Sequence, residues 1–312
     1  MPRTGARALA ALVAAASLAA GCGGTGEPAA APAAGASRGT LVIAVPRLAG
    51  ELDPLLAASP WDALVARQAF EPLVERLWPP YGQGAPEPGL ARRLSAARGQ
   101  AEWRLRLRPG VRFQDGSLLS AGAVLANVRR WQTTAAGQRL LPGLVAADAP
   151  RPDVVRLFFS RPQPALPRLL ASPRLGVVSP RALSPRSGEA ARLVRAENAG
   201  TGPFELRERS ASGLVLAANA GWWGRRERLG PALDQIQVRP APSPRERLAL
   251  LRSGEAQVAV GLPPGALRDA LRDPLLTTAR GAIALERSVR GLHAPSGAPS
   301  LASVWLTRIG AG

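Results

Sequence analysis

The chain has 312 residues, of which 46% are hydrophobic, so it is long enough to bury a large core in one domain or two. The formal net charge of +18 would suit nucleic acid or anionic lipid, but the arginines stand singly or in pairs without a nucleic-acid motif, which favours a solvated basic surface and no nucleic-acid partner. Because Cys22 is the only cysteine and His293 the only histidine, we expect no disulfide, no metal, no cofactor and no enzymatic activity.

The first 39 residues read as an export signal followed by a tether. A basic start, an apolar stretch over residues 8–20 and small residues before Cys22 predict a signal peptide over residues 1–21, too short to span a bilayer. The run Leu18-Ala19-Ala20-Gly21-Cys22 resembles the lipobox of bacterial lipoproteins, which implies cleavage before Cys22 and its lipid attachment. A buried cysteine in an alanine-rich helix is the alternative, but the glycines beside it disfavour a helix. Residues 22–39 lack bulky apolar side chains and predict a flexible tether.

The first half of the body predicts two strands and two helices. Residues 41–45 are a β-branched run that Pro46 closes, as in a buried strand. A helix should begin near Trp61 and end near Pro72. Residues 102–108 alternate between apolar and charged side chains, the pattern of a half-exposed strand. Ser120 is placed to cap the next helix.

The second half continues in the same mixed manner. Val155, Leu157 and Phe159 alternate in a strand, and residues 204–209 and 214–218 predict a hairpin. The run Ser243-Pro244-Arg245-Glu246 predicts a capping box that opens a helix, which Gly254 ends before a strand over residues 257–260. Strands and helices thus interleave irregularly, which predicts an α/β fold with a mixed sheet.

Several ordered motifs resemble the extracellular solute-binding proteins that serve peptide and nickel ABC importers, the family 5 type. The most specific is residues 103–116, which is similar to the family's Trp-x-Phe-x-Leu-Arg-x-Gly-Val-x-Phe-x-Asp-Gly signature. Others are Phe70-Glu71-Pro72-Leu73, Gly200-Thr201-Gly202-Pro203-Phe204, Asn219 with Trp222-Trp223, and the segments 233–236 and 250–260. Gln257 stands where the family usually has Asp.

The resemblance implies a type II periplasmic-binding-protein-like fold, here truncated to essentially one lobe. Residues 40–262 would form this lobe with its inserted subdomain, and residues 263–312 a shortened C-terminal segment that returns to it. The family's second lobe would be largely missing, so we expect an open site with weak affinity for a free peptide.

The implied function is that of a lipid-anchored solute-binding component of an ABC importer. Such a protein would lie in the cell envelope on the periplasmic or extracytoplasmic face, bind a peptide-like or similar small solute, contact the membrane through its N-terminal lipid and deliver solute to an ABC permease and ATPase. The alternative is a degenerate one-lobed relic that acts as an interaction or structural lipoprotein of the envelope.

Five residues are candidate ligand contacts. Arg47 and Glu51 follow the first predicted strand, where α/β sheets often receive ligands, and their charges would suit a ligand carboxylate and amine. Phe70 and Glu71 are similar to a cleft-facing pair of the family, and Trp222 is a candidate stacking platform. For each of them a solvated loop or core packing is the alternative, and for the tryptophans core packing is favoured.

Overall fold

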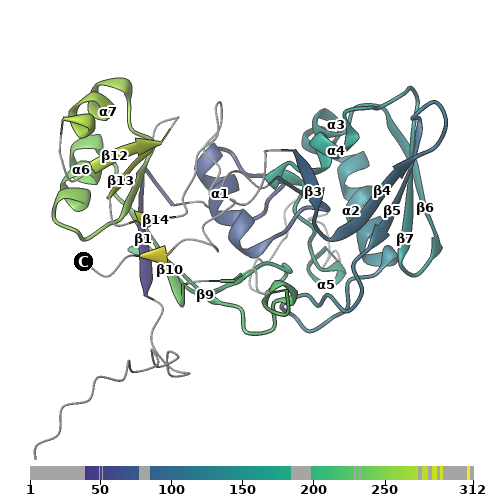
Figure 1. The fold of residues 1–312 in the computed structure, drawn as a ribbon, viewed down its shortest axis with the longest axis horizontal. Helices are drawn as coiled ribbons and strands as arrows, with labels where there is room; N and C mark the ends of the chain where they lie inside the picture. Colours follow the sequence, from purple (N-terminus) through teal and green to yellow (C-terminus); the bar gives the residue numbers. More distant parts are fainter. Residues whose placement is uncertain are drawn as a thin grey trace, which may run out of the picture. The chain divides into compact units, whose positions relative to one another are not determined.

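The computed structural model describes residues 39–48, 50, 52–76, 85–183, 198–227, 230–231 and 233–272, and the backbone of four later strands. Cys22, Glu51 and His293, together with the predicted signal peptide and nearly all of the predicted tether, lie outside the described residues. The described chain contains a seven-stranded sheet and a four-stranded sheet, each with helices packed on it (Figure 1).

The seven-stranded sheet is mixed and has the order β12-β13-β11-β1-β10-β9-β8. Its central strand β1 (Thr40–Val45) runs parallel to β10 (Gln235–Pro240) and to β11 (Val258–Val260). The other pairings are antiparallel and involve β8 (Phe204–Ser210), β9 (Gly213–Ala218), β12 (Leu276–Ala279) and β13 (Ile283–Glu286). The predicted mixed sheet and the predicted hairpin, formed by β8 and β9, are thus confirmed.

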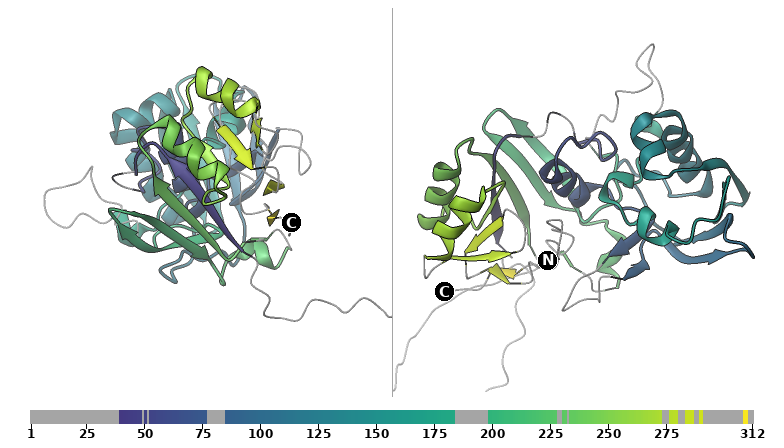
Figure 2. Two further views of the ribbon diagram at one scale, coloured as in Figure 1. Left: turned by 90° about the vertical axis from the view of Figure 1, so that its left-hand side faces the viewer. Right: turned by 90° about the horizontal axis from the view of Figure 1, so that it is seen from above.

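Helices cover both faces of this sheet. Successive side chains of β1 point to opposite faces, so they pack in two different cores. Leu41 and Ile43 of β1 pack in a core that includes Leu64 of α1 (Pro60–Ala69). Ala44 lies in a separate core with Leu248 of α6 (Pro244–Arg252), beside α7 (Pro264–Leu271). Figure 2 shows α6 and α7 side by side on their face of the sheet.

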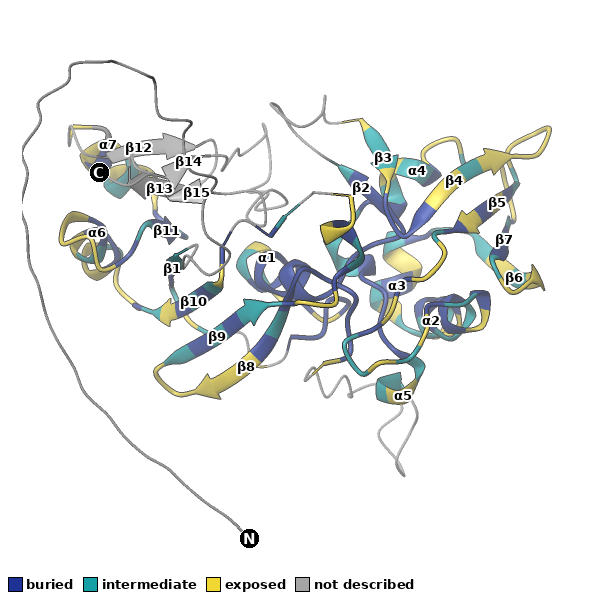
Figure 3. Cartoon of the chain, turned by 60° about the horizontal axis from the view of Figure 1, so that its bottom comes forward, coloured by how far each residue is buried: buried dark blue, intermediate teal, exposed yellow. Residues whose placement is uncertain are grey.

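The four-stranded sheet is antiparallel, with the order β4-β5-β7-β6. Its strands are β4 (Ala91–Ala96), β5 (Glu102–Leu107), β6 (Leu144–Arg151) and β7 (Val154–Phe159). The predicted alternation of β5 is confirmed, because Trp103, Leu105 and Leu107 are buried in a second large core. The helices on this side are α2 (Ala121–Thr133), α3 (Ala135–Leu140) and α4 (Leu166–Leu170). Figure 3 shows exposed residues along the outer strands β4 and β6.

The remaining described elements are short. Two further antiparallel pairs are β2 (Val74–Arg76) with β3 (Pro86–Pro88), and β14 (Val289–Arg290) with β15 (Arg308–Ile309). Between them in the chain lie α5 (Pro180–Leu183) and the 3-10 turns η1 (Pro173–Leu175) and η2 (Trp223–Arg225).

Serine caps begin the longer helices. The Ser120 hydroxyl accepts a bond from the Ala123 amide at 3.2 Å, which confirms the predicted start of α2. The Ser243 hydroxyl likewise accepts a hydrogen bond from the Glu246 amide at 3.0 Å. This is one of the two hydrogen bonds of the predicted capping box, the one that the serine side chain accepts. The complete reciprocal box occurs instead at α1, between Ser59 and Asp62.

Candidate functional site

A buried carboxylate, that of Glu71, lies just after the end of α1 and contacts the loop that follows β9. Glu71 is 6% exposed, and its two carboxylate oxygens accept hydrogen bonds from two neighbouring indoles. Trp222 donates from Nε1 to Oε1 at 3.0 Å, and Trp223 donates from Nε1 to Oε2 at 2.9 Å. The two indole rings are tilted by 55° with centroids 5.5 Å apart, so both reach one carboxylate. These two hydrogen bonds hold the loop after β9 against Glu71.

Close backbone contacts hold Glu71 in place. The Gly202 amide donates to the Ala69 carbonyl at 2.8 Å, and the Val177 amide donates to the Glu71 carbonyl at 2.9 Å. At Gly200 a Cβ atom would lie 1.8 Å from the Ala69 oxygen, and at Gly202 it would lie 2.5 Å from the Gln68 oxygen. The Gly-Thr-Gly motif is therefore required where this segment crosses the end of α1.

Asn219 sets the turn that carries the two tryptophans. Its side-chain amide donates to the Gly202 carbonyl at 2.9 Å, and its side-chain oxygen accepts from the Gly221 amide at 2.9 Å. The Asn and Trp-Trp motif and the Gly-Thr-Gly motif are thus parts of one contact around Glu71.

The electrostatics of this cluster favour the neutral form of Glu71. The pKa of Glu71 is raised to about 7, mainly by burial and also by the nearby charge of Glu75, whereas the indole hydrogen bonds act in the opposite direction. Burial also raises the pKa of Glu75, against the effect of its ion pair with the buried Arg67. Two acids and one buried base therefore share this region, and Glu71 changes charge near neutral pH.

A surface depression of about 260 Å³ lies beside the half-buried Trp223. The Arg108 guanidinium stacks on the Trp223 ring, 4.1 Å from its centroid, and pairs with Glu227. Arg92 and Arg226 are exposed on the rim and have no ion pair among the described residues. The full lining is Arg92, Arg108, Pro109, Gly110, Trp223, Arg226 and Glu227. An aromatic ring beside two unpaired arginines suits a solute with a carboxylate.

The structure brings three of the five candidate contacts together. Phe70, Glu71 and Trp222 lie in one cluster, but Phe70 is fully buried and Trp222 is 3% exposed. Arg47 pairs at 3.0 Å with Asp62 in the first turn of α1, and about 10 Å of helix separates Asp62 from the end of α1, beyond which Glu71 lies. Glu51 is outside the described residues, and ligand contact by any of the five stays a prediction.

Residues that the sequence did not single out complete this site. Arg108 lies in the signature segment, but its stacking on Trp223 joins positions 115 apart and has no local signal. Arg67 and Glu75 form a buried ion pair, and the only sign of it in the sequence is that both residues lie near the end of α1. Within the described ranges no group of three metal-ligating side chains occurs, and none of the helices there is long and apolar enough to cross a bilayer.

Comparison with known proteins identifies the family. Residues 85–291 match the family model described as bacterial extracellular solute-binding proteins, family 5 Middle. The glutathione-binding protein GsiB of Escherichia coli K12 is 32% identical over 163 residues, which is 51% of this chain and 30% of that protein. NikA from Brucella suis, solved in complex with Fe(III)-EDTA, is 25% identical, with a TM-score of 0.66 over 77% of this chain and 47% of that one.

The fold is also that of DppA from Helicobacter pylori, solved in complex with the peptide STSA. That structure is 21% identical, with a TM-score of 0.62 over 77% of this chain and 50% of that one. The chain thus spans half or less of the length of each of these relatives, and the described residues correspond to essentially one lobe of the predicted type II fold. Its relatives are binding proteins, in agreement with the expectation that the chain is not an enzyme. The match over residues 85–291 places the chain in family 5 of the bacterial extracellular solute-binding proteins.

Proposed function

We propose that the chain is the solute-binding component of an ABC importer and takes a peptide-like solute that carries a carboxylate. The family match is the observation that carries this proposal. The names of two relatives, a glutathione-binding protein and a peptide-bound DppA, support a peptide-like ligand. Such a protein acts in the periplasm or on the extracytoplasmic face with an ABC permease and ATPase.

The depression beside Trp223 is the proposed contact surface for the solute. Arg92 and Arg226 would pair with its carboxylate, because a guanidinium can donate two parallel hydrogen bonds to such a group. Glu71 and Trp222 lie behind Trp223 and hold its ring in position. In this proposal Trp223, which is more exposed than Trp222, takes the stacking role predicted for Trp222.

A melting-temperature screen with short peptides and small amino acids tests the function. A ligand that binds only the folded state raises its stability by mass action, so a true solute should raise the melting temperature as its concentration increases. Absence of any concentration-dependent shift across the library would argue against solute binding and would favour an interaction protein of the envelope.

Lipid attachment at Cys22 is proposed from the lipobox-like run alone. The protein expressed in a bacterial host should enter the detergent phase in a phase-separation assay, and the Cys22→Ser variant should stay in the aqueous phase. The assay is run at high salt, which screens electrostatic adsorption to detergent or lipid. Equal partitioning of the two proteins would disprove the anchor.

A further inference from the structure

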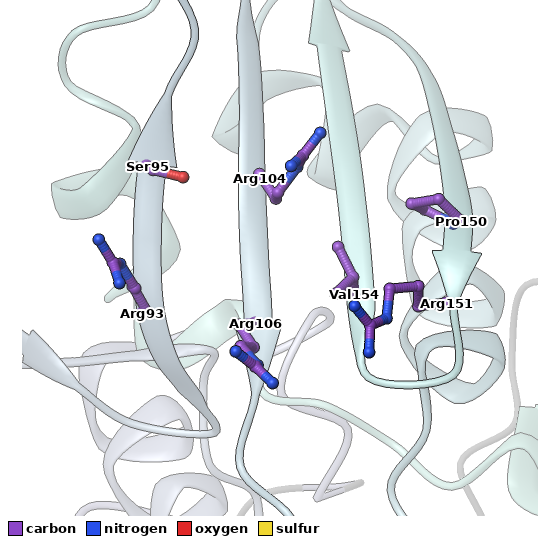
Figure 4. Close-up of a pocket in the computed structure, with 7 residues that line it drawn as sticks. All are labelled: Arg93, Ser95, Arg104, Arg106, Pro150, Arg151 and Val154. Carbon is purple, nitrogen blue, oxygen red and sulfur yellow. The ribbon is translucent and has the colours of Figure 1, made fainter.

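The outer face of the four-stranded sheet carries a row of arginines on adjacent strands. A groove of about 480 Å³ runs across this face, lined by Arg93, Ser95, Arg104, Arg106, Pro150, Arg151 and Val154. Figure 4 shows these side chains along neighbouring strands. The helices α2, α3 and α4 lie on the other side of the sheet, next to its apolar core (Figure 1).

The strand register places like charges next to one another. Arg93 of β4 is directly opposite Arg106 of β5, and Arg104 of β5 is directly opposite Arg156 of β7. Like charges at such positions destabilise a sheet, because their Cβ atoms are only about 5 Å apart. An anionic partner would remove this repulsion.

Acidic neighbours compensate only part of the charge. Asp148 and Glu102 pair with Arg156, and Asp153 pairs with Arg106 and Arg151. Arg93 and Arg104 are exposed and make no ion pair with any described residue. The face therefore keeps two cations without direct acidic partners, although Asp148 lies near enough to Arg104 to interact weakly.

The backbone shows which kind of anion this face suits. β5 is paired along both edges, with β4 on one side and β7 on the other, so its amides have partners within the sheet. A built pocket for one small anion usually offers backbone amides, whereas here long arginine side chains are the available donors. Such an open array of arginines on neighbouring strands suits a surface that presents many phosphates at once.

We propose that this face, defined by Arg93, Arg104, Arg106 and Arg151, binds the phosphate groups of an anionic phospholipid surface. Arginine donates hydrogen bonds to phosphate in a forked geometry, and each basic residue near an anionic bilayer contributes favourably. The binding does not require solute capture, so it stands or falls independently of the importer function.

Vesicle co-sedimentation of the full chain carrying Cys22→Ser tests the proposal without a lipid anchor. The protein should sediment with phosphatidylglycerol-containing vesicles and not with pure phosphatidylcholine vesicles. The double variant Arg93→Gln with Arg104→Gln breaks no ion pair with a described residue and should lower the partition coefficient about 30-fold. The charge-preserving variant Arg93→Lys with Arg104→Lys should retain most of the binding.

The matched control removes two charges elsewhere. Arg245 of α6 and Arg268 of α7 are also exposed and have no ion pair in the described ranges, and replacing both with Gln should change the partition coefficient much less. Equal losses in the two double variants would show that only net charge matters and would overturn the proposal. Full displacement by millimolar inorganic phosphate at constant ionic strength would indicate a small-anion site instead and would also overturn it.

Discussion

Glu71 and Trp222, 151 positions apart in the sequence, are joined by a 3.0 Å hydrogen bond between a buried carboxylate and an indole. Trp223 donates to the other oxygen of the same carboxylate, and Arg108 stacks on its ring. The Glu71 carboxylate therefore links the end of α1 to Trp222 and to Trp223, whose ring lines the proposed solute surface.

The pH dependence of stability should report the ionisation of Glu71. Its folded-state pKa of about 7 is raised above the usual 4.5, so the folded state binds the proton more tightly than the unfolded state. The resulting stability is fully present below about pH 4.5 and is lost as the pH rises through about 7, with a total effect of about 3 kcal/mol. Glu75, whose pKa burial also raises, acts in the same sense.

Urea unfolding across this pH range measures the effect. Glu71→Gln should flatten the decline, because the amide does not ionise. Glu255→Gln is the control: Glu255 is exposed and hydrogen bonds from Arg239 and Ser253 lower its pKa, so this variant should leave the decline unchanged. If the Glu71 variant shows the wild-type slope, Glu71 does not titrate as described.

Loss of the indole donor should be most costly when Glu71 is charged. Trp222→Phe keeps most of the apolar packing but removes one donor, and we expect a loss of about 1–3 kcal/mol in unfolding free energy at high pH and less at low pH. Trp103→Phe provides the comparison, since its Nε1 donates to the neutral Gln100 carbonyl at 3.1 Å. Its cost should not depend on pH, and a pH-independent cost at Trp222 would contradict the proposed pairing.

The close approach at Gly200 should not tolerate a side chain. Gly200→Ala would place a Cβ atom 1.8 Å from the Ala69 oxygen and should lower the unfolding free energy by about 2–4 kcal/mol. In Gly122→Ala the new methyl group meets only the Ser120 hydroxyl, at 3.7 Å, and the substitution favours the helix. Thermal or urea unfolding of the two variants should therefore give changes of opposite sign. Similar stability of both variants would show that the segment moves freely.

The sequence predicted correctly those elements that depend on interactions between residues close together in the chain. The alternation in β5 and the serine cap of α2 follow from side-chain period and from unpaired helix amides, and both appear as expected. The Asp115-Gly116 turn is also local: Gly116 has a φ of +82°, and the Asp115 carboxylate accepts from the Ser117 amide at 2.8 Å.

The site depended on contacts that no local pattern contains. Nothing around Glu71 in the sequence indicates that two indoles from a distant loop will donate hydrogen bonds to its buried carboxylate. Arg47 was expected at a ligand site because it follows β1, but its nearest acid is Asp62, which also caps α1. Tertiary pairing thus decided that Arg47 is paired, whereas Arg92 and Arg226 at the proposed surface have no ion pair with any described residue.

Titration calorimetry with a carboxylate-bearing peptide selected in the melting-temperature screen tests the central claim most directly. The full chain carrying Cys22→Ser should bind the free-acid peptide saturably and its C-terminally amidated form at least about 10-fold more weakly, because a charge-assisted pair is lost. Arg92→Gln with Arg226→Gln should remove this difference, whereas Arg245→Gln with Arg268→Gln should preserve it. Equal binding of both peptide forms by the unmodified site, or no saturable binding of any library member, would contradict the proposed solute-binding role of this surface.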